Sequence, residues 1–289
     1  MNRPSPSQTG IDEAVTEPEH ADGLPGPQPP AIDVREVSKR YRLPNDDHVL
    51  ALDTVSLRIE REEVVCFLGP SGCGKTTLLS LIAGLDRPTR GSITVNAQPV
   101  VGPHTDLGIV FQKDLLLEWR TCVSNVLLQM EMRGLLRTRE AKATYRAKAL
   151  ELLDRMGLHN FAEAYPRHLS GGMRQRVGIA RALIHDPGLL LMDEPFGALD
   201  ALTRDRLDLE VASLAAQSRK TILFVTHSIP EAVFLGDRVV VFSASPGRIA
   251  ADVAIELPRP RTLAVYDEPA FTAYAKRLRG LLGGEETLG

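Results

Sequence analysis

Cysteine, tryptophan and long apolar runs are scarce in this sequence, and each scarcity excludes a class of protein. The 289 residues include three cysteines and one tryptophan. Cys66, Cys73 and Cys122 are too few and too far apart for a disulfide framework or a zinc site, which is typical of a reducing cytosol. No apolar run approaches the ~18 residues that a membrane-spanning helix requires. The sequence therefore predicts no membrane span, and any work at a membrane would be that of a peripheral subunit.

An excess of positive charge is also absent. Lysine and arginine number 34 against 37 aspartates and glutamates, and the formal net charge of -3 gives no general attraction to nucleic acid. A chain of this length with 43% hydrophobic residues can bury one large α/β core and also carry a subdomain or a tail. Residues 1–30 are rich in proline and lack the apolar segment of a secretory signal, so we expect a disordered tail there.

Short, continuous apolar runs occur along the chain, with helical stretches between them. The runs lie at residues 64–68, 189–192, 222–225 and 239–242, with helical patterns near 202–218 and 229–236. Looser alternation predicts further strands at residues 32–41, 49–59, 92–95 and 107–111. Continuous apolar strands that alternate with helices predict a mostly parallel sheet buried on both faces.

Residues 113–186 and 258–289 have a helical pattern instead. In the first segment, Thr138 and Gly157 are typical of the start and the end of a helix, and we expect a helical insertion in an α/β domain. The second segment is predicted to be an extension of the domain. Its amphipathic helix would centre on Phe271, Tyr274, Leu278 and Leu281.

A glycine-rich loop after the apolar run at 64–68 carries the strongest chemical signal. Its residues are Gly69, Pro70, Ser71, Gly72, Cys73, Gly74, Lys75, Thr76 and Thr77. Glycines let the backbone close around an anion, so that N–H groups and the positive end of the following helix point at a phosphate. Lys75 supplies a cation for the β- and γ-phosphates, and the Thr76 hydroxyl is placed to bind Mg²⁺. The loop therefore predicts nucleotide binding, and Cys73 within it is expected to be accessible to thiol reagents.

Polar residues follow several predicted strands, at what would be one edge of the sheet. Asp193 can reach a Mg²⁺ ion through water, and Glu194 can act as general base toward the attacking water. His227 and Gln112 also follow strands, and we expect them to contact the γ-phosphate, the water or the metal ion. The alternatives are a solvated surface turn for the two acids, a structural histidine, and an ordinary strand cap for Gln112.

Ser170, Gly171 and Gly172 form a second candidate anion site. Ser170 can cap a helix, and the two glycines leave the first N–H groups of that helix bare. Because the motif lies in the helical insertion, we expect it to serve the nucleotide of another copy of the chain. The alternative is a capped helix with a flexible start.

These motifs, in this order and spacing, resemble the nucleotide-binding subunits of ABC transporters over about residues 32–257. The matching positions are Tyr41, residues 69–77, Gln112, residues 169–173, residues 189–194, residues 198–200 and His227. The resemblance implies an α/β fold: a P-loop NTPase (RecA-like) core with a mostly parallel sheet, an antiparallel β-subdomain and an inserted helical subdomain. It also implies a head-to-tail dimer that holds two ATP molecules between the loop of one subunit and Ser170, Gly171 and Gly172 of the other.

The same resemblance assigns roles to further residues. Tyr41 would stack on adenine and Asp200 would link the two nucleotide sites. Thr76, Gln112 and Asp193 would serve the Mg²⁺ ion.

Within that family, residues 111–119, 168–176, 231–239 and 257–261 look like the nitrate/sulfonate/taurine importer group. Glu118, Ser228 and Glu62 depart from the usual pattern, at positions where a proline, an acid and a glycine are common. The resemblance implies an ATP-hydrolysing subunit, peripheral at the cytoplasmic face of the cell membrane, that drives uptake of a small anionic solute.

The implied partners are a second nucleotide-binding subunit, an integral membrane permease and a solute-binding protein. The second subunit is identical or paralogous, the permease docks near the groove after Gln112, and the solute-binding protein is periplasmic or lipid-anchored. Nucleic acid is not an expected partner. Two alternatives stay open: an export or lipid-handling ATPase on the same fold, and an ATP-driven clamp that acts on ribosomes or DNA.

Overall fold

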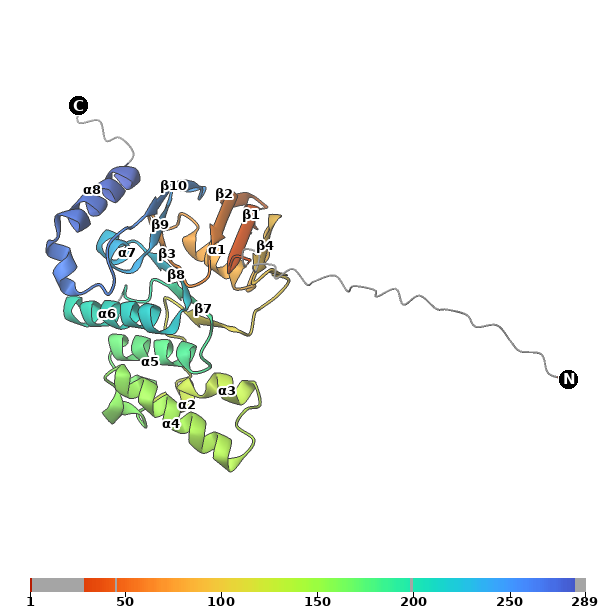
Figure 1. Ribbon diagram of the computed structural model, residues 1–289, viewed down its shortest axis with the longest axis vertical. Helices are drawn as coiled ribbons and strands as arrows, with labels where there is room; N and C mark the ends of the chain where they lie inside the picture. The colour runs from red at the N-terminus through yellow and green to blue at the C-terminus, as the bar shows by residue number, and fades with distance from the viewer. Residues whose placement is uncertain (2–28, 45, 198–199, 284–289) are drawn as a thin grey trace.

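The computed structural model describes residue 1 and residues 29–44, 46–197 and 200–283, which form two β-sheets with helices packed around the larger one (Figure 1). The smaller sheet contains β1 (Ile32–Arg42), β2 (His48–Ile59), β4 (Arg90–Val95) and β5 (Gln98–Pro99). The larger contains β3 (Val64–Leu68), β6 (Leu107–Val110), β7 (Leu189–Asp193), β8 (Thr221–Thr226), β9 (Arg238–Phe242) and β10 (Ile249–Ala254). The strand orders are β2-β1-β4-β5 and β10-β9-β3-β8-β7-β6.

The larger sheet is parallel except at one edge, where β10 pairs antiparallel with β9. Successive residues of a strand face opposite sides of a sheet. In β3, Cys66 belongs to the apolar cluster on one face and Phe67 to the cluster on the other. Every residue of β3, β7 and β8 is buried. The predicted sheet, mostly parallel and buried on both faces, is therefore confirmed.

One face of this sheet packs against α1 (Lys75–Ile82) and the smaller, antiparallel sheet. The fold class expected from the sequence is thus confirmed, including the antiparallel β-subdomain. Two short strands were not predicted, because β5 has only two residues and β10 alternates between exposed and half-buried positions for most of its length. Glu62, at a turn where the family pattern has glycine, adopts a φ of 62° in the left-handed region.

The other face carries the helices, including those inserted between β6 and β7. These are α2 (Cys122–Val126), α3 (Leu128–Met132), α4 (Arg139–Arg155) and α5 (Gly171–Leu183), with 3-10 turns at His159–Phe161 and Pro166–His168. Helix α4 begins and ends where predicted: the Thr138 hydroxyl accepts the Ala141 N–H at 3.1 Å, and Gly157 has a φ of 67°. In Figure 1 this helical layer extends away from both sheets.

Helices α6 (Ala201–Ser218), α7 (Ile229–Leu235) and α8 (Pro269–Gly283) complete the same side, with a 3-10 turn at Leu263–Asp267. The buried Arg261 guanidinium donates to the carbonyls of Val233, Phe234 and Gly236, at the end of α7, where helix carbonyls have no partner within the helix. Phe271 and Leu278 of α8 are buried, as its predicted amphipathic pattern requires. Leu281 is 38% exposed, and Leu282 packs against the core in its place, so the prediction was wrong at that position.

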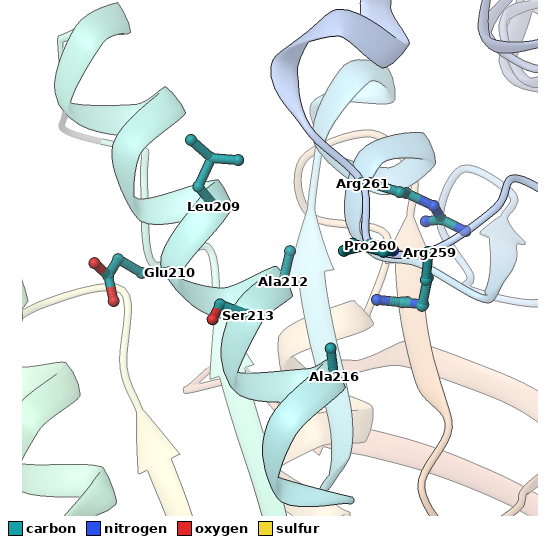
Figure 2. A pocket seen from close by; sticks show the side chains of 8 residues that line it. All are labelled: Leu209, Glu210, Ala212, Ser213, Ala216, Arg259, Pro260 and Arg261. Atoms are coloured by element: carbon teal, nitrogen blue, oxygen red, sulfur yellow. The ribbon is translucent and has the colours of Figure 1, made fainter.

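A hollow of about 690 Å³ lies between α6 and the arginine segment 259–261 (Figure 2). Ala212, Ser213 and Ala216 line it from the helix, and Arg259 and Arg261 from the segment. None of its lining residues belongs to the predicted nucleotide site. None of the helices in the described ranges combines the length and apolarity needed to cross a membrane.

Asp208 of α6 is a buried acid whose replacement should stabilise the fold. Burial, with Glu231 and Asp205 nearby, raises its pKa to about 8, and Arg204 only partly offsets this. The native state therefore holds a proton that the unfolded chain releases, so Asp208 makes the protein less stable as pH rises from about 4 to about 8. We expect Asp208→Asn to raise Tm by roughly 2–6 °C at pH 8 and by less at pH 5.

Thermal denaturation followed by circular dichroism at both pH values measures this effect. Asp267→Asn, at an exposed position, serves as the matched control and should leave Tm unchanged. An equal shift for Asp208→Asn at both pH values would contradict the raised pKa.

Candidate active site

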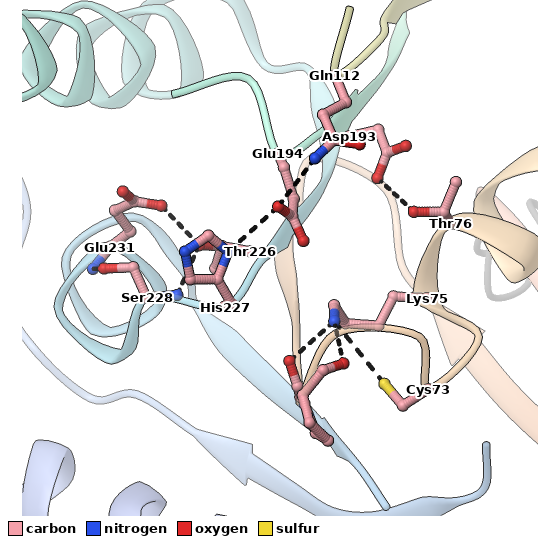
Figure 3. Close-up of polar contacts among 12 residues, drawn as sticks. Cys73, Lys75, Thr76, Gln112, Asp193, Glu194, Thr226, His227, Ser228 and Glu231 are labelled. Carbon is pink, nitrogen blue, oxygen red and sulfur yellow. Dashed lines mark hydrogen bonds and ion pairs between the residues drawn. The ribbon is translucent and has the colours of Figure 1, made fainter. Parts of the chain in front are cut away.

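The candidate site lies at the carboxyl ends of four parallel strands (Figure 3). Gly69 directly follows β3, Gln112 is the second residue after β6, Asp193 ends β7 and His227 directly follows β8. Parallel strands present their carboxyl ends at the same edge, and this edge is where open α/β sheets bind ligands. The polar residues predicted from separate parts of the sequence therefore meet in one place.

The glycine-rich loop wraps around the ammonium group of Lys75. Lys75 is 4% exposed, and its Nζ donates to the Gly69 and Pro70 carbonyls at 2.8 Å each. Gly74 has a φ of 98°, and a Cβ there would lie 2.7 Å from the Ala51 carbonyl oxygen. The loop thus encloses the ammonium group of Lys75, the first residue of α1, as a site for a phosphate group requires.

Two of the three loop glycines, Gly72 and Gly74, should differ in their tolerance of a side chain. Gly72 has a φ of 76° but open space around its Cβ position, whereas Gly74 combines positive φ with a backbone clash. We expect Gly74→Ala to weaken ATP binding by roughly 10–100-fold, and Gly72→Ala by less, since its cost is confined to about 1–2 kcal/mol of backbone strain. Isothermal titration calorimetry with ATP tests this order, with Gly280→Ala in α8 as the control. Equal affinities for both loop variants would refute the packing argument.

Cys73 is not accessible, contrary to the expectation from the sequence. It is 1% exposed because its Sγ turns inward, where it lies 3.7 Å from Lys75 Nζ and 2.9 Å from the Cβ position of Gly69. Cys66 is fully buried in β3, and burial raises the pKa of its thiol.

Asp193 and Thr76 form a pair of oxygen ligands at the loop. The Thr76 hydroxyl donates to Asp193 Oδ1 at 2.8 Å. Burial raises the pKa of the Asp193 carboxyl, and the hydrogen bond from Thr76 opposes this. A carboxylate that is desolvated and stands beside a hydroxyl has the chemistry that Mg²⁺ prefers, and a cation here would compensate its charge. The residues present therefore fit the metal expected from the sequence.

Glu194 lies between the two other predicted catalytic residues. Its Oε2 is 3.4 Å from the donating Gln112 Nε2 and 3.1 Å from His227 Nδ1, which donates when it carries the ring proton (Figure 3). Its backbone has a φ of 43°, and such conformations in non-glycine residues occur preferentially at functional sites. Because both contacts use Oε2, Oε1 is the oxygen that can take a proton from water.

Tyr41 is 39% exposed and contacts two residues, Lys39 and Asp86, that belong to no predicted motif. The Tyr41 hydroxyl donates to Asp86 Oδ2 at 3.1 Å, and Lys39 Nζ lies 4.8 Å from the centroid of its ring. Lys39 also donates to Asp86 Oδ1 at 2.6 Å. The Lys39 ammonium group thus lies over the Tyr41 ring, whose electron-rich face attracts a cation.

Ser170 caps α5 as predicted, since its hydroxyl accepts the Met173 N–H at 3.3 Å. Helix α5 also binds the segment on both sides of Gln112. Gln175 donates to the Phe111 carbonyl at 3.0 Å, Arg174 pairs with Asp114 at 2.9 Å, and Arg181 donates to the Asp114 and Leu115 carbonyls. Gln112, Glu118, Gly171 and Pro195 line one hollow of about 530 Å³.

Asp200 caps α6 and accepts the Thr203 N–H at 3.0 Å. Residues 198–199, which precede it in the predicted motif, lie outside the described residues. Sequence reasoning also missed Thr226 and Glu231, which contact each other beside His227. The spacing Ser228-x-x-Glu231, typical of a helix start, was the available signal.

A glycine loop around a lysine, a carboxylate beside a hydroxyl, and a parallel α/β sheet together define a P-loop nucleoside triphosphatase. Residues 52–197 match the protein family described as "ABC transporter". An uncharacterized ABC transporter ATP-binding protein of Methanocaldococcus jannaschii is 45% identical over 88% of this chain and 92% of its own length. The chain therefore belongs to the ABC transporter family, as one of its ATP-binding subunits.

Two other relatives are named for the solute that they import, and one similar protein has a solved structure. A nitrate import ATP-binding protein of Synechocystis sp. is 46% identical over 83% of this chain and 90% of its own length. A taurine import ATP-binding protein of Jannaschia sp. is 47% identical over 75% of this chain and 79% of its own. A solved dimeric ATP-binding cassette in a post-hydrolysis state, bound to ADP and Pi, gives a TM-score of 0.70 at 33% identity, covering 78% of this chain and 100% of that one.

Proposed function

We propose that this chain is the ATP-hydrolysing subunit of an importer for a small anionic solute of the nitrate, sulfonate or taurine kind. The observation that carries the proposal is the convergence of Lys75, Asp193, Glu194 and His227 at one sheet edge. The names of the nitrate and taurine import relatives support the direction of transport and the class of solute.

Each residue of the site has a proposed task. Lys75 and the loop N–H groups bind the phosphates of ATP, while Thr76 and Asp193 hold Mg²⁺, with Gln112 beside them. Mg²⁺ supplies charge neutralisation for the phosphates when it is bound. Glu194 takes the proton of the attacking water, and His227 orients the Glu194 carboxylate. Tyr41, which is exposed, stacks on the adenine ring.

Ser170, Gly171 and Gly172 are proposed to bind the nucleotide of a second copy or a paralogue in a head-to-tail dimer. The first N–H groups of α5 and the positive end of its dipole suit a phosphate. Asp200, at the start of α6, would link the two sites. The dimeric state of the solved cassette supports this arrangement.

The proposed docking place of the permease is an apolar groove of about 410 Å³ beyond Gln112. Phe111, Leu115, Leu128 and Met132 line it, together with Arg133 and Arg181. Leu115 is 54% and Met132 79% exposed, so the groove opens to solvent and can receive a short apolar segment. The subunit would then sit at the cytoplasmic face of the cell membrane.

Reconstitution tests the proposal. The chain, its co-encoded permease and its solute-binding protein are placed in liposomes, and we expect the solute-loaded binding protein to stimulate ATP hydrolysis several-fold with uptake of the solute. Met132→Glu should abolish the stimulation by disrupting the groove, while Glu151→Gln on α4 should not. Stimulation by ribosomes or DNA without any effect of the permease would favour the clamp, and activity without a binding protein would favour an exporter.

A further inference from the structure

His227 is flanked by two residues whose polar groups are joined to each other. The Thr226 hydroxyl donates to Glu231 Oε2 at 2.6 Å and accepts the Ser228 N–H at 2.9 Å (Figure 3). The Ser228 hydroxyl in turn accepts the Glu231 N–H at 3.4 Å. Thr226 is 2% and Glu231 7% exposed, so these bonds form away from solvent. The backbone is therefore tied down immediately before and immediately after His227.

This arrangement is a modified helix cap. In an ordinary capping box, the glutamate at the third helical position bonds directly to the N–H of the cap residue. Here the cap residue is Ser228 and the glutamate is Glu231, but the Thr226 hydroxyl stands between them. As a result, the cap of α7 includes the last residue of β8 and encloses the peptide units of His227.

The imidazole needs such support because packing does not hold it. The His227 side chain is 56% exposed, and its contact with Glu194 is a single hydrogen bond of 3.1 Å. An exposed side chain is placed mainly by its backbone, and a shift of about 1 Å at a catalytic group can lower a rate by roughly 100-fold.

Glu231 is also anchored on its other oxygen. Arg204 Nε of α6 lies 3.5 Å from Glu231 Oε1, so the carboxyl group contacts both α6 and β8. Removing Glu231 would therefore remove these two side-chain contacts of α7, with α6 and with β8, while the phosphate loop after β3 would keep all of its own contacts.

We propose that Glu231 is a positioning residue for hydrolysis, which acts through the Thr226 hydroxyl to hold His227 against Glu194. The proposal rests on the proposed ATPase function, since it assigns His227 and Glu194 to the chemical step. Glu231 belongs neither to the phosphate loop nor to the proposed Mg²⁺ ligands, so its loss should lower kcat and leave KM for ATP unchanged.

Thr226→Val tests the hydrogen bond between Thr226 and Glu231, because valine removes the hydroxyl and keeps nearly the same side-chain shape. We expect kcat for ATP to fall at least tenfold, KM to change less than twofold, and Thr226→Ser to restore most of the rate. The matched control is Thr221→Val, which removes another buried hydroxyl from β8 that accepts the Glu62 N–H at 3.0 Å, at the opposite end of the strand. Thr221→Val should lower Tm to a similar extent without lowering kcat.

Glu231 itself is tested by Glu231→Gln and Glu231→Ala. The glutamine keeps an oxygen for Thr226 and should retain most of the rate, whereas the alanine should lose at least tenfold in kcat. In a His227→Ala background, Thr226→Val should have no further effect on kcat, because the residue that it positions is gone.

The outcomes separate this proposal from the function on which it rests. An unmodified protein that does not hydrolyse ATP would overturn the proposed function. If the unmodified protein hydrolyses ATP and Thr226→Val does not lower kcat, the positioning role alone is overturned. The same holds if Thr226→Val lowers kcat by the same factor with and without the His227→Ala substitution.

Discussion

Replacing Glu194 with glutamine is expected to preserve ATP binding and to lower the rate of hydrolysis by about 10²–10⁴-fold. Glutamine has the same shape and keeps an oxygen for the contacts with Gln112 and His227, but an amide does not take a proton from water. The loop contacts of Lys75 are unchanged, so the affinity for ATP should stay within about threefold. In the proposed dimer, the variant should accumulate in an ATP-bound closed state.

Phosphate release assays measure the rate, and size-exclusion chromatography with and without ATP detects the trapped dimer. The control is Glu151→Gln, which makes the same chemical change on the exposed surface of α4. Hydrolysis at the unmodified rate in Glu194→Gln would exclude Glu194 as the general base.

Replacing Lys75 with alanine is expected to weaken ATP binding by roughly 10–100-fold. A hydrogen bond to a charged group contributes about 1.5–3 kcal/mol, and about 1.4 kcal/mol corresponds to a factor of ten in affinity. Lys75 is a buried cation whose charge lies inside the loop and whose only hydrogen-bond acceptors in the described residues are two carbonyl oxygens and the Cys73 sulfur. Its removal takes the positive charge from the place where phosphates would lie.

Titration calorimetry with ATP gives the dissociation constant, and circular dichroism confirms that the variant is folded. Lys142→Ala on the exposed surface of α4 removes the same charge elsewhere and should leave the affinity unchanged. ATP affinity in Lys75→Ala equal to that of the unmodified chain would contradict the phosphate-loop assignment.

The position of the site at the sheet edge could be predicted from the sequence, because the polar residues stand at the ends of the buried strands. The buried run of β7 ends in Asp193, and the buried run of β8 ends just before His227. A parallel arrangement follows from the alternation with helices, and it alone brings these residues together. The caps of α4 and α5 were predictable for a similar local reason, since Thr138 and Ser170 act on N–H groups three residues away.

The contacts that position these residues were not predictable, because they join distant segments. Asp86 contacts Lys39 and Tyr41 across a separation of more than forty residues, and Arg204 reaches Glu231 from another helix. The burial of Cys73 depends on which way its side chain turns within the loop, and sequence spacing carries no information on that. Strand β10 lacked an apolar run and is defined by its pairing with β9.

Helix α5 has a mechanical consequence. Its first turn carries Gly171 and Gly172. Further along, Arg174, Gln175 and Arg181 bind the segment at residues 111–115, which includes Gln112. A helix of 13 residues is a stiff rod about 20 Å long, so its two ends cannot move independently. In the proposed dimer, a tilt that the second subunit imposes on the first turn of α5 would thus displace Gln112 from Glu194, so that closure at one nucleotide site would change the geometry of the other.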